Sequence, residues 1–323
     1  MKPTKDSAAF RRARTVALAL VAALAIVLLA ACGSPKKSAD PGTQGGSGAP
    51  DGAAEQPVKL MDEGHVIRIA DGRLLVTAPA SRDGQSFVDA YTLRIKEDTE
   101  IEDEAGGTLK ADDLRAGMRV EVWAAGPIAE SYPAQANAAR VKVLADPEPQ
   151  EGVVPRREAV RVALESLDGE GFAPAVGAVE WDGDLSIWLV RLVRPQEEPA
   201  DVQVDGETGR AIAAGNDAFR VFAPQPGTEV GPSFTVEGKA RVFEAVFHWT
   251  LEDGHIVLDQ GVEMADGGAP AWGDFRFEAS YDKATQQNLM LILYVHSAKD
   301  GSVEKELFVP LKAPDHLVDQ EMR

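Results

Sequence analysis

Apolar and polar residues alternate in short runs over residues 58–145, with turn residues between the runs. The alternation is clearest over Arg119–Trp123, where Val120 and Val122 share one face. Glycine turns such as Asp71-Gly72 separate the runs. Five short strands in this length of chain predict a small β-barrel of the OB kind. The expected strands are His65–Ile69, Leu74–Ala78, Phe87–Ile95, Arg119–Ala124 and Ala138–Leu144.

The pattern changes to a helical period over Arg156–Leu167. One apolar face of this expected helix carries Val160, Ala163, Leu164 and Leu167. Short strands and a turn at Asp205–Gly209 follow the helix. This order predicts a small α+β module. Its expected strands are Ala175–Trp181, Ser186–Val193, Ala200–Val204 and a return strand Arg210–Ala213.

The last part of the chain returns to the period of strands, with turn residues at regular intervals. Seven short strands of this kind predict an antiparallel, immunoglobulin-like β-sandwich. The fold class is therefore mainly β and multidomain. The expected strands are Phe219–Ala223, Ser233–Ala240, Ala245–Glu252, Ile256–Ala265, Gly273–Ser280, Asn288–His296 and Val303–Val309.

The N-terminus has a different pattern, with five basic residues and one acidic residue in the first fifteen. An uninterrupted apolar run, Val16–Ala31, follows. This run is shorter than the ~20 residues that a membrane-spanning helix needs. A basic segment followed by such a run predicts a secretory signal.

The chain's one cysteine, Cys32, stands directly after this run in the string Leu29-Ala30-Ala31-Cys32-Gly33. The string resembles the lipobox of bacterial lipoproteins. The resemblance implies cleavage before Cys32, a lipidated thiol and a place on the extracytoplasmic face of the cell membrane. Two acyl chains hold a protein stably on a membrane where one does not. An ordinary secretory signal or an uncleaved anchor helix is the alternative.

Residues 33–57 are rich in Gly, Pro, Ala and Ser and predict a flexible tether with a reach of roughly 25–30 Å. A Pro- and acid-rich stretch at 146–152 marks a second boundary. The expected parts are a signal peptide 1–31, a tether 32–57, a barrel domain 58–146, an α+β module 147–217, a sandwich domain 218–312 and a tail 313–323.

Three strings in the barrel region occur together: Asp98–Ile101, Leu114–Val122 and the ESYPAQ string at 130–135. They resemble a domain of unknown function found in small lipoproteins of Gram-positive bacilli. In the next region, Trp188–Val190 and Val204–Ile212 resemble a PepSY-like module. The second resemblance implies an inhibitor or chaperone-like regulator of an exported protease.

Four motifs occur in order in the last module, and together they resemble the immunoglobulin-like domain of bacterial spore germination proteins. Gly231 and His296 stand where that family often has Ser and Glu. The resemblance implies a place at the spore or cell envelope. The motifs are Phe222–Pro232, Val236–Ala245, Ala271–Phe275 and His296–Ser302.

The formal net charge is −19, and it becomes −23 when the first 31 residues are removed. Such an acidic chain is not expected to bind nucleic acid, which requires basic patches. A single cysteine excludes an intramolecular disulfide and thiolate metal sites. The negative charge is spread over all three modules, so it indicates a generally acidic surface.

No catalytic pattern appears among the nucleophiles and histidines. The five histidines lack zinc-hydrolase spacing, and serine-nucleophile, P-loop and dinucleotide motifs are absent. We therefore expect no enzyme, no cofactor and no metal. The acidic run 97–104 is interpreted as a solvated strand edge, with a weak cation contact as the alternative. Asp205-Gly206-Glu207 is interpreted as a hairpin turn, with oxygen ligands for a metal as the alternative.

A small contact patch is the remaining candidate site, formed by Glu130, Tyr132, Gln135 and Trp272. The competing interpretations are a loop that packs Tyr132-Pro133 against the barrel and a strand that points Trp272 inward. The expected function is a non-enzymatic, lipid-anchored envelope protein that binds or scaffolds in sporulation or germination. Its expected partner is an envelope protein or peptidoglycan. A protease regulator is the alternative, and an envelope hydrolase has the least support.

Overall fold

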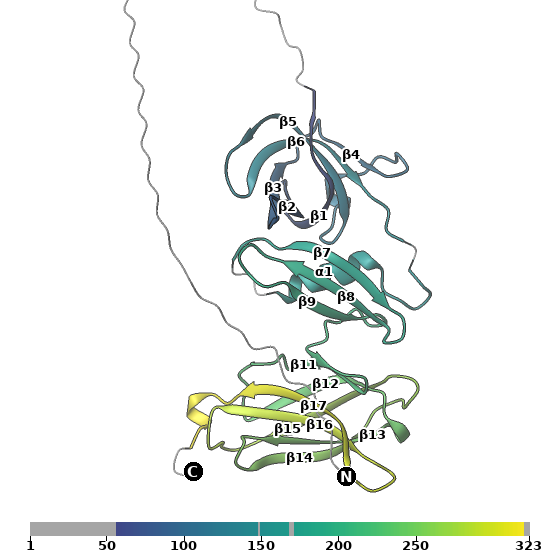
Figure 1. Ribbon diagram of the computed structural model, residues 1–323, viewed down its shortest axis with the longest axis vertical. Helices are drawn as coiled ribbons and strands as arrows, with labels where there is room; N and C mark the ends of the chain where they lie inside the picture. The colour runs from purple at the N-terminus through teal and green to yellow at the C-terminus, as the bar shows by residue number, and fades with distance from the viewer. Residues whose placement is uncertain (1–55, 148, 168–170, 320–323) are drawn as a thin grey trace, which may run out of the picture. The chain divides into compact units, whose positions relative to one another are not determined.

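The computed structural model describes residues 56–147, 149–167 and 171–319, which are mainly β-structure with one α-helix (Figure 1). They form a barrel, an α+β module and a β-sandwich, which confirms the predicted multidomain β class. The expected signal peptide, Cys32 and nearly all of the tether lie outside the described residues. Within the described part of the chain, no helix is long and apolar enough to cross a membrane.

The first module is a closed barrel with the strand order β3-β2-β1-β5-β6. Parallel pairing of β3 with β6, from Tyr91–Ala134 to Arg94–Asn137, closes the sheet. Fully buried side chains such as Leu74, Val76 and Val120 fill its interior. The strands are β1 Val58–Ala70, β2 Arg73–Arg82, β3 Gln85–Arg94, β4 Glu100–Asp103, β5 Arg119–Ala129 and β6 Ala134–Val143, with a 3-10 turn at Ala111–Asp113.

Strand β1 begins seven residues before its predicted start at His65. Its pairing with β5 is irregular between Lys59 and Met61 and again between Met61 and Gly64. Each irregularity breaks the alternation of inward and outward side chains. The alternation of apolar and polar residues therefore predicts only the second half of this strand.

The second module places one helix against a three-stranded sheet of order β7-β8-β9. Val160 and Ala163 of the helix are fully buried in its core, as predicted. The expected return strand at 210–213 is wrong, because this segment forms a single bridge from Ala211 to Val204. The elements are α1 Arg156–Ser166, β7 Ala175–Asp182, β8 Ile187–Val193 and β9 Ala200–Asp205.

The third module is a sandwich of two four-stranded sheets, β10-β11-β12-β15 and β14-β13-β16-β17. All seven predicted strands are present, and four of them have the predicted bounds. The strands are β10 Ala214–Gly215, β11 Phe219–Ala223, β12 Ser233–Ala240, β13 Val246–Glu252, β14 Val257–Met264, β15 Gly273–Ser280, β16 Asn288–His296 and β17 Val303–Lys312, with 3-10 turns at Phe243–Ala245 and Asp315–Leu317.

Aromatic rings fill the interior of the sandwich. The ring of Phe247 lies 5.5 Å from that of Phe219 and 4.9 Å from that of Phe275, measured between centroids. Trp249 stacks on Phe277 at 4.7 Å. A Cβ atom at Gly261 would lie 2.6 Å from Nε1 of Trp249, so this glycine makes room for the indole. Burial of such rings contributes several kcal/mol each and closes the core without a disulfide.

His65 of the barrel is buried beside the start of the helix, with 5% of its surface exposed. Its Nε2 atom lies 3.4 Å from both terminal nitrogens of Arg156, which also pairs with Asp146 at 3.3 Å. Burial, followed by the charge of Arg156, lowers the pKa of His65 to about 4. The folded protein therefore favours the neutral imidazole.

This depressed pKa makes stability depend on pH. The contribution of neutral His65 is complete above about pH 6.5, the pKa of an unfolded histidine, and is lost as the pH falls toward 4. We predict that the unfolding free energy loses up to about 3 kcal/mol over this window through His65 alone. Chemical denaturation at several pH values should show a smaller loss in His65→Gln. The exposed His316→Gln control should follow the parent protein, and identical pH profiles for all three proteins would contradict the assignment.

Candidate functional site

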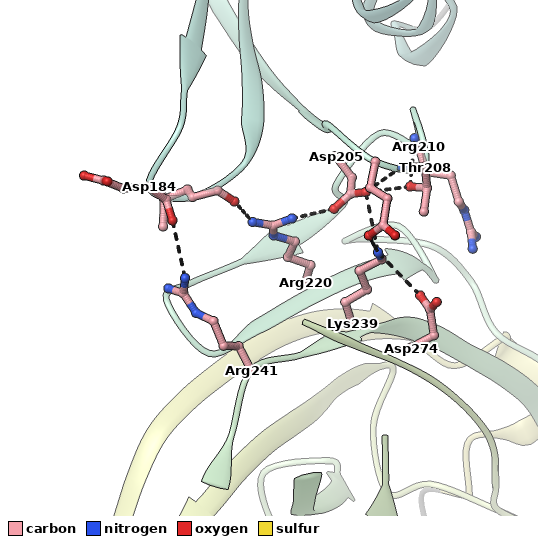
Figure 2. A network of polar contacts seen from close by, with 10 residues as sticks. Asp184, Asp205, Thr208, Arg210, Arg220, Lys239, Arg241 and Asp274 are labelled. Carbon is pink, nitrogen blue, oxygen red and sulfur yellow. Dashed lines mark hydrogen bonds and ion pairs between the residues drawn. The ribbon is translucent and has the colours of Figure 1, made fainter. Parts of the chain in front are cut away.

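The sandwich is joined to the α+β module by a buried polar network (Figure 2). Asp205 ends β9, and its Oδ1 atom accepts hydrogen bonds from the backbone N–H of Thr208 at 2.9 Å and its hydroxyl at 2.8 Å. These bonds fix the turn that the sequence predicts at 205–209. The turn presents the second carboxylate oxygen of Asp205 to the sandwich.

Two cations of the sandwich meet this carboxylate. Arg220 of β11 forms an ion pair with Asp205, and the Nζ atom of Lys239 in β12 lies 4.0 Å from it. All three side chains are less than 5% exposed. Lys239 also pairs with Glu207 and lies 4.0 Å from Asp274. The buried charges are therefore compensated from both modules, as burial of charge requires.

The pKa values follow from this arrangement. Burial works to raise the pKa of Asp205. The hydrogen bonds from Thr208 and the charges of Lys239 and Arg220 outweigh burial, so this pKa lies below the usual value of an aspartate. Burial lowers the pKa of Arg220, although Asp205 opposes that effect. The ion pair remains charged at neutral pH.

Trp272 lies against the guanidinium groups of Arg220 and Arg241, which are 3.8 and 4.8 Å from its ring centroid. The same arginines reach the carbonyl oxygens of Leu185 and Asp184 in the turn before β8. Contacts with the α+β module therefore cover the part of sheet β10-β11-β12-β15 around Arg220, Lys239 and Trp272, whereas Arg276 and Glu278 of β15 are exposed.

The outer side of the other sheet is largely apolar, and we call it the apolar face. On β13 and β16 its side chains alternate with fully buried ones such as Phe247 and Leu291. Cross-strand register places Val262 and Tyr294 on either side of His248, and Phe308 opposite Ile292. The apolar face consists of Val246, His248, Val262, Met264, Met290, Ile292, Tyr294, Phe308 and Pro310, with Thr250 and Gln260 between them.

A hollow of about 750 Å³ adjoins the apolar face, and we call it the Phe243 hollow. Val246, His248 and His296 line it, and the first two also belong to the apolar face. The two imidazole rings are 4.6 Å apart between centroids. Partial burial and then His296 lower the pKa of His248. Further lining residues are Asp217, Arg241, Val242, Phe243, Glu244, Ala269, Pro270, Val295, Ser297, Ala298, Glu304 and Lys305.

Strained backbone surrounds this hollow. Glu244, Ala245 and Lys305 have positive φ angles of 57°, 61° and 61°, although none of them is glycine. The side chain of Phe243 is 76% exposed beside them. Left-handed conformations cost roughly 1 kcal/mol or more at such residues and are concentrated at functional sites.

The predicted contact residues are not brought together. Glu130, Tyr132 and Gln135 lie on the barrel, around the connection between β5 and β6. The hydroxyl of Tyr132 donates to the carbonyl of Val88 at 3.2 Å, and its ring lies edge-on to Phe172 of the α+β module at 5.6 Å. These contacts agree with the alternative in which Tyr132 packs its loop against the barrel. Trp272 belongs instead to the polar network.

The acidic run 97–104 spans the turn before β4, β4 itself and the start of the turn after it. Glu102 pairs with Arg140, and Asp103 accepts the N–H of Gly107 at 2.7 Å. Glu104 accepts the N–H of Ala145 at 2.8 Å. Among the residues that the structure describes, no group of three or more His, Cys, Asp or Glu side chains could hold a metal ion.

Arg241, Phe243 and Glu244 stand in the motif Val236–Ala245, for which the sequence predicted no role in a site. Neither Arg220 nor Lys239 was predicted to be a site residue. A signal for these two was present, because both are charged residues at outward positions of strands with apolar alternation. Their shared partner, Asp205, lies in another module, so only the folded structure shows this contact.

Comparisons with known proteins support two of the expected resemblances. Residues 218–302 match the model of the immunoglobulin-like domain of bacterial spore germination, and residues 63–145 match that of a protein of unknown function (DUF3221). No curated protein matches the chain. A crystal structure of the extracellular domain of a one-component system from B. thetaiotaomicron is similar at 10% identity and a TM-score of 0.15. That similarity covers 78% of this chain and 57% of the other.

We predict that Arg220→Met lowers the unfolding free energy by about 3–5 kcal/mol, because it removes the nearer of the two cations that compensate the buried carboxylate of Asp205. Replacing both residues, Asp205→Asn with Arg220→Met, should restore part of this loss. Denaturant titration measures both effects. The control is Arg191→Met, which breaks an ion pair with Asp201 that is about half exposed and should cost less than about 1 kcal/mol. Equal losses for the two arginine variants would contradict the role of the network.

Proposed function

We propose that this chain is a non-enzymatic, lipid-anchored envelope protein whose immunoglobulin-like domain binds a partner in sporulation or germination. The observation that carries the proposal is the apolar face with its adjoining hollow on the domain that matches the germination family. Part of the opposite side of that domain is already engaged by the α+β module through Arg220. The partner that we propose is an envelope protein or peptidoglycan.

The anchor is supported by the signal pattern and by the lipobox-like string before Cys32. A tether of about 25 residues would hold the folded modules roughly 25–30 Å from the membrane. This distance suits a protein that presents a binding surface to the envelope. An exposed apolar surface of this kind is typical of an interaction site on a chain that is otherwise strongly acidic.

The anchor leads to one prediction. Cys32→Ala should abolish incorporation of labelled palmitate and release the protein from the membrane fraction or block its processing, because the acyl acceptor is lost. Ser34→Ala, two residues away, is the control and should remain labelled. Lipid labelling that persists in Cys32→Ala would refute the anchor.

The binding surface leads to another prediction. The soluble fragment 58–323 should retain an envelope protein or peptidoglycan from envelope extracts. Phe308→Lys should reduce this retention about ten-fold, because it places a charge in the apolar face. The matched control is Ile128→Lys, which changes an exposed apolar residue of the barrel. Retention of nothing by the parent fragment, or equal retention by both variants, would contradict the proposed surface.

A further inference from the structure

The positively charged residues that line the Phe243 hollow have partners, whereas two of its carboxylates have none among the described residues. Lys305 forms an ion pair with Asp217, and Arg241 donates to the carbonyl oxygen of Asp217 at 3.0 and 3.2 Å. Within the described part of the chain, the carboxylates of Glu244 and Glu304 have no ion-pair or hydrogen-bond partner. The hollow therefore offers an incoming group two available negative charges, while its two positive charges are already engaged.

The same hollow has apolar walls. Val246 and Val295 are half-buried there, and Phe243 presents a largely exposed ring. Lysine and arginine side chains lay their methylene stems along apolar surface and keep the charged head near acceptors. Such a cation also gains from an aromatic ring within about 6 Å. Apolar walls combined with unpaired carboxylates fit this chemistry, whereas an acidic group would be repelled by the two carboxylates and would find both cations already engaged.

The geometry points to a basic segment of a partner protein as the occupant: an extended stretch in which a lysine or arginine enters the Phe243 hollow and neighbouring apolar residues cover the apolar face. This inference rests on the proposed binding function and names the chemistry of its partner. His248 lies on both surfaces, so the hollow and the apolar face form one continuous site. The net charge of −19 adds long-range attraction for a basic partner.

A protein segment fits better than a small molecule because of the shape of the site. Val262 and Tyr294, on the two strands that flank His248, continue the apolar surface beyond the hollow. A lone cation could fill the hollow but would leave this surface uncovered. An extended segment places successive side chains about 3.3 Å apart, and alternate ones on the same side, so it can occupy both parts at once.

Three fluorescein-labelled tetrapeptides test the inference by anisotropy with the full chain in non-ionic detergent micelles: Leu-Lys-Leu-Lys, Leu-Gln-Leu-Gln and Leu-Glu-Leu-Glu, each amidated. We expect the lysine peptide to bind at least about five-fold more tightly than the glutamine peptide, and the glutamate peptide to bind most weakly. Added salt should reduce the difference. Equal binding of the three peptides, or no binding of the lysine peptide at millimolar concentration, would overturn the inference.

Variants of the two unpaired carboxylates test whether the lysine peptide binds in the Phe243 hollow. Glu244→Gln with Glu304→Gln should weaken the lysine peptide about five-fold and leave the glutamine peptide unchanged. The matched control, Glu97→Gln with Glu151→Gln, removes the same charge from exposed positions outside the sandwich and should have little effect. Equal losses in the two double variants would show general charge attraction only, which would count against the hollow.

The outcomes separate this inference from the proposed function. If fragment 58–323 retains an envelope partner through the apolar face but the peptides show no preference for lysine, only the chemistry assigned to the hollow is wrong. If the lysine preference is present but no envelope component is retained, the hollow binds basic side chains and the proposed envelope role fails.

Discussion

The arrangement of the sandwich on the α+β module depends on the burial of one carboxylate. Asp205 is 1% exposed, and a bare charge at such a depth would cost several kcal/mol. Its compensation comes from Arg220 and Lys239, which lie on two adjacent strands of one sheet. The turn that carries Asp205 supplies two hydrogen bonds from Thr208, and the sheet supplies the compensating positive charges. Stability and orientation are therefore coupled, because rotation of the sandwich would separate Asp205 from Arg220 and Lys239.

This constraint gives the two outer sides of the sandwich different roles. One side uses charged residues of β11 and β12 to hold the neighbouring module. The other, on β13 and β16, alternates its apolar side chains with the buried core, and Glu252 is the charged residue among the β13 positions. An apolar face on a chain of net charge −19 is not explained by solubility. The binding function that we propose accounts for it, and the polar network holds the α+β module against the other sheet.

The sequence predicted local structure well and the site poorly, for a physical reason. The bounds of strand Gly273–Ser280 were predicted correctly because its period of two is uninterrupted. Strand β1 and the segment 210–213 were misjudged where bulges or a single bridge replace regular pairing. The network joins residues 15 and 35 positions apart, and the Phe243 hollow joins residues as distant as Asp217 and Lys305. Periodicity carries no information on such contacts. For Trp272 the sequence offered a contact patch or an inward-pointing strand, whereas the indole lies against the guanidinium groups of two arginines.

The strained residues at the hollow show how stability and recognition are balanced there. Glycine would adopt the positive φ angles of Glu244 and Lys305 at no steric cost. Each position instead carries a long charged side chain and bears roughly 1 kcal/mol of strain. Lys305 uses its side chain to neutralise Asp217. Glu244 forms no side-chain hydrogen bond or ion pair within the described chain, so no polar contact of the fold accounts for the strain. An unpaired carboxylate held in a costly conformation beside an exposed phenylalanine is better explained by what it offers to a partner than by what it does for the fold.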